Sequence, residues 1–149
     1  MVDFKKDTWM YILIAAVLVI ISLFTPIASD TAGGITFQYW WTGAIAFVDG
    51  GGYDAVWMGF NNATLWTMGI SAFCAALLLF YGLHGMKGME FKWDWLVTLL
   101  IGITLIIFPI LMLVYDSDPD TMIGFAPIGI LISGIICVVV FVLEKFMGD

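Results

Sequence analysis

The chain has 149 residues, of which 62% are apolar and 11% are charged, and its formal net charge is −7. This composition leaves too little polar surface for a water-soluble globule, so it predicts a protein whose exterior faces lipid. A nucleic-acid-binding protein usually carries a basic surface, whereas this chain is acidic, so we expect no nucleic-acid partner.

Four apolar stretches reach the roughly 20 residues that a helix needs to cross a hydrocarbon core about 30 Å thick. None of the four contains an acidic residue, a basic residue or a histidine. We therefore expect one all-α membrane domain over residues 1–149, a bundle of four transmembrane helices. The expected helices cover residues 9–27, 63–83, 95–115 and 122–143.

The basic residues lie before the first stretch, between the second and third, and after the fourth, and all are lysines: Lys5, Lys6, Lys87, Lys92 and Lys145. Positive residues are retained on the cytoplasmic face of a membrane. The sequence therefore predicts a multi-pass protein of the cell membrane, with both termini in the cytoplasm and the long first loop outside.

The first outer loop, residues 28–62, contains a segment that alternates from Ile35 to Trp41, which is typical of a strand. The turn residues Asp49 to Gly52 separate it from a second candidate strand, Tyr53 to Phe60. We therefore expect a small antiparallel sheet in this loop. A re-entrant helix through Trp41 to Val48 is the alternative.

Two strands alone are marginal in water and leave their edges unprotected, so the expected sheet needs a cover. The short loop between the third and fourth helices is one candidate. The interpretation that we prefer is that a neighbouring copy or a membrane-protein partner pairs with the edge and buries the aromatic side chains. Trp40, Trp41 and Trp57 are then the candidate interface anchors.

Small residues let helices approach each other closely in lipid, where the acyl chains compete equally for large apolar side chains. The fourth and second stretches both carry such residues along one side. We expect the two stripes to face each other or another subunit, with Gly129 and Ser133 as contact residues. The stripes are Ala126, Gly129, Ser133 and Cys137, and Gly69, Ala72 and Ala76.

Asp116, Asp118 and Asp120 repeat at every second residue of the second outer loop, and oxygen ligands suit Ca²⁺. The pattern departs from a helix-loop-helix calcium loop, because the sixth position is Thr121 and the twelfth is Pro127. A solvated acidic rim is the preferred interpretation, and a calcium site is the alternative. No other metal or cofactor is expected.

The sequence lacks the residues of a nucleophilic triad or a zinc site, because the only histidine, His84, has no cysteine or second histidine near it. We therefore expect no catalytic residues and a non-enzymatic protein. Asn62 begins an Asn-Ala-Thr pattern for glycosylation on the outer side. Its position at the point of membrane entry, where a sugar would be crowded, argues against occupancy.

Four helices with inside termini, a long first outer loop with tryptophans and a short second one resemble the claudin and peripheral-myelin-protein group of tetraspan proteins. In that group's loop pattern, Trp40 or Trp41 takes the place of the first tryptophan and Trp57 the place of the later one. The Gly-Leu before the later tryptophan and both loop cysteines are absent here. The resemblance implies the four-helix architecture and lateral association.

Two classes of function follow from these features. In the first, the protein is a structural tetraspan that forms homo-oligomers through its aromatic outer loop. In the second, it is an accessory subunit that packs its small-residue stripes against a larger membrane enzyme or transporter. All five basic residues are lysines and none is an arginine, and the helices are rich in isoleucine. This composition suggests a bacterial or archaeal source with an AT-rich genome.

Overall fold

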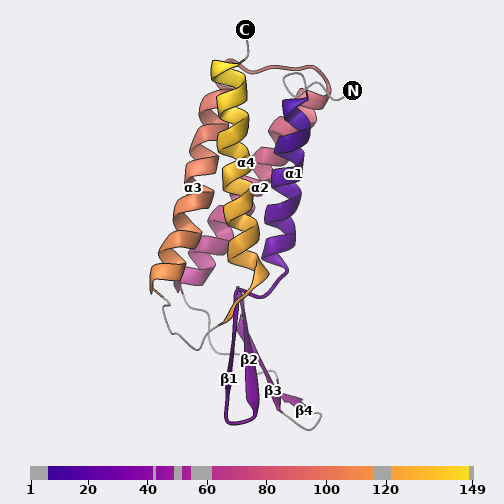
Figure 1. The fold of residues 1–149 in the computed structure, drawn as a ribbon. Coiled ribbons are helices and arrows are strands. Elements are labelled where there is room, and N and C mark those ends of the chain that lie inside the picture. The colour runs from indigo at the N-terminus through magenta and orange to yellow at the C-terminus, as the bar shows by residue number, and fades with distance from the viewer. Residues whose placement is uncertain (1–6, 42, 49–51, 55–61, 116–121, 148–149) are drawn as a thin grey trace.

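The computed structural model describes residues 7–41, 43–48, 52–54, 62–115 and 122–147. Four helices in this part of the chain run side by side, with both chain ends at one end of the bundle and a β-sheet at the other (Figure 1). The helices are α1 (Thr8–Leu23), α2 (Asn62–Met86), α3 (Asp94–Tyr115) and α4 (Phe125–Phe146). The expected mostly helical fold with four helices and a small antiparallel sheet is therefore confirmed.

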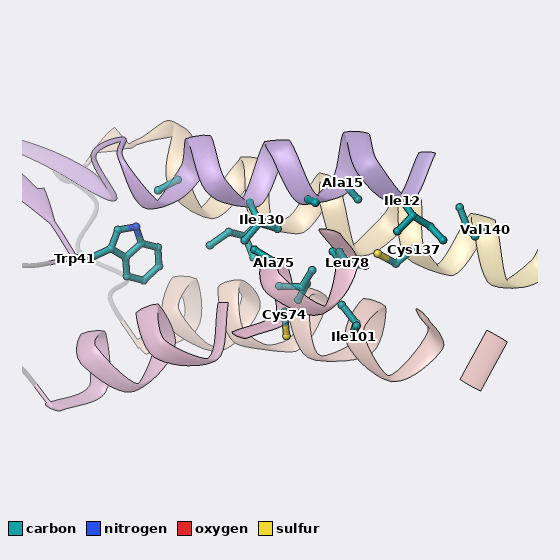
Figure 2. Close-up of a cluster of buried hydrophobic side chains, with 14 of the residues drawn as sticks. Ile12, Ala15, Trp41, Cys74, Ala75, Leu78, Ile101, Ile130, Cys137 and Val140 are labelled. Carbon is teal, nitrogen blue, oxygen red and sulfur yellow. The ribbon is translucent and has the colours of Figure 1, made fainter. Parts of the chain in front are cut away.

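The bundle is held by a continuous apolar core between the helices (Figure 2). Helix α1 packs along α2 and α4, and α4 packs along α3, whereas α2 and α3 meet over a shorter length. Each helix contributes fully buried side chains, which stabilise the packing because neighbouring atoms fill the space around them. The largest of these are Leu78, Leu105, Ile130, Val19 and Val140.

Within the described residues, α2, α3 and α4 are long and apolar enough to cross a membrane. Helix α1 is shorter, with 16 residues, and ends at Leu23. The expectation that the first helix continues to residue 27 is wrong. Thr25 precedes Pro26, and a residue before proline is driven out of the helical region. The chain has also entered the sheet at Ile27, whose N–H donates to the Tyr39 carbonyl at 2.7 Å.

Helix α4 also begins later than the expected residue 122, at Phe125. Met122 and Ile123 form the short strand β5, because they pair with Ser29 and Ala28. The helix then extends to Phe146, three residues beyond the expected end. The sequence therefore predicted this helix, but the backbone of the first residues of the apolar run belongs to the sheet.

The sheet has five antiparallel strands in the order β4-β3-β2-β1-β5. Strand β2 confirms the predicted strand after Ile35, while β3 excludes the re-entrant helix over residues 41–48. Only the start of the second predicted strand is described, as β4, and residues 55–60 lie outside the described part. The first four strands are β1 (Ala28–Ala32), β2 (Ile35–Trp40), β3 (Gly43–Val48) and β4 (Gly52–Asp54), and β5 (Met122–Ile123) follows α3.

The hairpin between β1 and β2 turns on two glycines, Gly33 and Gly34, whose φ values are 61° and 79°. Positive φ at both central residues is the requirement of the tight turn that matches the twist of two antiparallel strands. The pairing of Thr31 with Thr36 follows directly, and their hydroxyl oxygens lie 3.1 Å apart. This turn fixes the register of the two strands.

The sheet and the bundle are joined by backbone hydrogen bonds around Pro26 and Ile27, which we call the sheet–bundle junction. The N–H of Gly124 donates to the Ile27 carbonyl at 2.8 Å, and the N–H of Ala126 donates to the Pro26 carbonyl at 3.2 Å. A Cβ on Gly124 would collide with the Pro26 backbone. The close approach at this point therefore requires glycine.

The small-residue stripe of α4 is buried inside the chain, where it meets α1. A Cβ added to Gly129 would collide with the Ser22 hydroxyl, and Ser133 is also fully buried. The stripe of α2 is exposed at Gly69, Ala72 and Ala76. The two stripes therefore do not form one shared contact.

We predict that Gly129→Ala lowers the free energy of unfolding by about 1–3 kcal/mol, the usual cost of inserting a methyl group into a packed site. The added methyl group would meet both Ser22 and the Phe125 ring. Gly69→Ala is the matched control, because nothing lies within 4 Å of its added Cβ. Thermal unfolding in detergent measures both, and equal melting temperatures would contradict the assigned α1–α4 contact.

Candidate interaction surface

The pairing of the strands divides the sheet into two faces, because directly opposed residues in antiparallel strands project to the same side. Asp30, Phe37, Tyr39, Ala46 and Val48 project to one side, which we call the Tyr39 face. The other side is the Trp40 face, formed by Ser29, Thr31, Thr36, Gln38, Trp40, Ile45, Phe47 and Met122.

The Trp40 face is uncharged over its described residues, whereas the Tyr39 face carries Asp30. Both faces have exposed apolar side chains, which are Val48 and Ile123 on the Tyr39 face. Met122 is 74% exposed at the β5 edge, and Phe47 on β3 is 39% exposed. Hydroxyl and amide side chains from Ser29, Thr36 and Gln38 lie between them. A surface of apolar side chains interspersed with neutral polar ones is typical of a protein–protein interface. It offers no opposite charge to bind a charged ligand.

Trp40 itself is half-buried at the bundle end of this face. Its indole Nε1 is buried and has no acceptor among the described residues. A buried N–H normally has a hydrogen-bond partner, so this group costs free energy where it stands. Part of the ring remains accessible, and the more exposed Phe47 and Met122 provide most of the apolar surface of this face.

Trp41 has a different role from the one expected from the sequence. It is 2% exposed and belongs to the core (Figure 2). Its indole Nε1 donates to the Ser22 carbonyl at 3.0 Å, at the end of α1 where carbonyls lack helical partners. Trp41 therefore fixes the sheet to the bundle and offers no exposed surface to a partner.

The other predicted site residues are placed as follows. Gly129 and Ser133 lie inside the bundle, where the Ser133 hydroxyl donates to the Gly129 carbonyl at 2.8 Å. Asn62 is the first residue of α2. Trp57 and the aspartates of the calcium alternative, Asp116, Asp118 and Asp120, lie outside the described part of the chain.

His84 is held at the other end of the molecule by its neighbours. Its Nδ1 lies 2.8 Å from the Phe80 carbonyl, and its ring centroid is 4.1 Å from that of Phe80 and 5.5 Å from that of Phe91. No group of three His, Cys, Asp or Glu side chains in the described residues is arranged to hold a metal ion. The surface that the fold presents best is therefore the Trp40 face.

No protein-family model matches the chain, and no curated protein sequence is similar to it.

We predict that Trp41→Phe lowers the free energy of unfolding by about 1–3 kcal/mol, because it removes both a buried hydrogen bond and part of a core side chain. Trp40→Phe is the matched control and should leave the stability unchanged or raised, because its buried N–H has no acceptor among the described residues to lose. Thermal unfolding of both variants in detergent tests this. A larger loss for Trp40→Phe would contradict the assigned roles.

Proposed function

We propose that the protein is an integral membrane protein that crosses the bilayer with all four helices. The outward sides of the helices support this, because they carry large apolar side chains. Exposing these side chains to water costs free energy, whereas exposing them to lipid does not. On α1 they are Ile14, Val17 and Ile21, and on α4 they are Ile128, Ile132, Ile135, Val139 and Val142. Helix α1 is about 24 Å long at 1.5 Å per residue, a shortfall that local bilayer thinning accommodates.

The proposed orientation places the chain termini in the cytoplasm and the sheet outside. Lys87, Lys92 and Lys145 are exposed at the end of the bundle where the chain ends lie. The sheet end carries Asp30 instead. Lysines retained on the inner side favour this orientation over its reverse.

Cysteine labelling from outside tests the orientation. Thr31→Cys in the exposed part of β1 should react with an impermeant thiol reagent in intact cells, whereas Lys87→Cys should react only after the membrane is opened. The native thiols, Cys74 and Cys137, are both buried, which keeps the background low. The reversed pattern would overturn the orientation.

We further propose that the protein is a non-enzymatic, claudin-like tetraspan that associates with copies of itself through the Trp40 face. The observation that carries this proposal is the exposure of Phe47 and Met122 on an uncharged face at the end of the bundle. That face lies outside the hydrocarbon layer in the proposed orientation, so lipid does not cover it. Contact with a second protein surface would remove these side chains from water.

The Trp40 face suits such a contact better than the sheet edges do. Within the described residues, the edge strands β4 and β5 are three and two residues long. Strands of this length offer few backbone groups to a further strand. Side-chain packing between faces is therefore the proposed mode, in place of the edge pairing considered from the sequence.

The exposed stripe Gly69, Ala72 and Ala76 favours a second candidate function. It lies on α2 beside the exposed Phe73, and nothing lies within 4 Å of a Cβ built on Gly69. Small residues on a lipid-facing side permit another transmembrane helix to approach closely. An accessory subunit of a larger membrane enzyme or transporter would use this stripe.

We predict that Phe47→Ser weakens self-association about 30-fold, the equivalent of the roughly 2 kcal/mol of a strong interface residue. Trp40→Ala should act in the same direction with a smaller effect, because less of its ring is accessible. Val48→Ser is the matched control, because Val48 is its neighbour in β3 and 45% exposed on the opposite face.

Native mass measurement after gentle detergent extraction supplies the readout, with helix content as the check that each monomer is folded. Homo-oligomers that dissociate in Phe47→Ser and persist in Val48→Ser support the proposal. Equal dissociation in both variants would contradict use of the Trp40 face. A complex with a different protein that is lost in Gly69→Leu would favour the accessory subunit instead.

A further inference from the structure

We draw no further inference here: the strongest candidate, the cavity at the end of the bundle opposite the sheet, is lined by a cluster of acidic side chains, Glu90, Asp94 and Glu144, and no second feature in the described part of the chain points to a ligand for it.

Discussion

The fold depends on how the backbone at Ile27 is bonded where the chain leaves the first helix. Its N–H donates to the Tyr39 carbonyl and its carbonyl accepts from the Gly124 N–H, so one residue joins the segment between α1 and α2 to the segment between α3 and α4. The first bond continues the register that the Gly33-Gly34 turn sets between β1 and β2, and the second holds Gly124, the residue before α4, against the sheet. The indole of Trp41, bonded to Ser22, fixes the same region from the side of the core.

The helices were predictable from the sequence because each apolar run is long and free of charge, and that signal is local. The ends of the runs were not, because Pro26, Ile27 and the strand Met122–Ile123 bond to partners distant in the sequence. Strand β2 was predictable because its side chains alternate with the period of two that is typical of a strand. The segment Gly43–Val48 has small and apolar residues on both faces, so periodicity did not distinguish a strand from a helix there.

The sequence predicted a sheet with an aromatic surface, but it did not predict which of its tryptophans would be buried. Alternation placed Trp40 and Trp41 on opposite sides of a strand, but it gave no information about which side the bundle covers. The sequence did not predict that Glu90, Asp94 and Glu144 line one cavity at the bundle end opposite the sheet, because Glu144 is distant from the other two along the chain. The signal that was available is the position of Asp94 and Glu144 at the ends of apolar helices, next to aromatic residues.

The short edge strands limit how the sheet of one molecule can pair with the sheet of another. In the described part of the sheet, β4 and β5 end the strand order with three and two residues. Long free edges at high surface density would invite strand-by-strand growth into ribbons, as in aggregation. On the β5 side of the described sheet only Asp30, Thr31 and Ala32 of β1 extend past the paired residues, so the sheet of a second molecule would gain few backbone hydrogen bonds there.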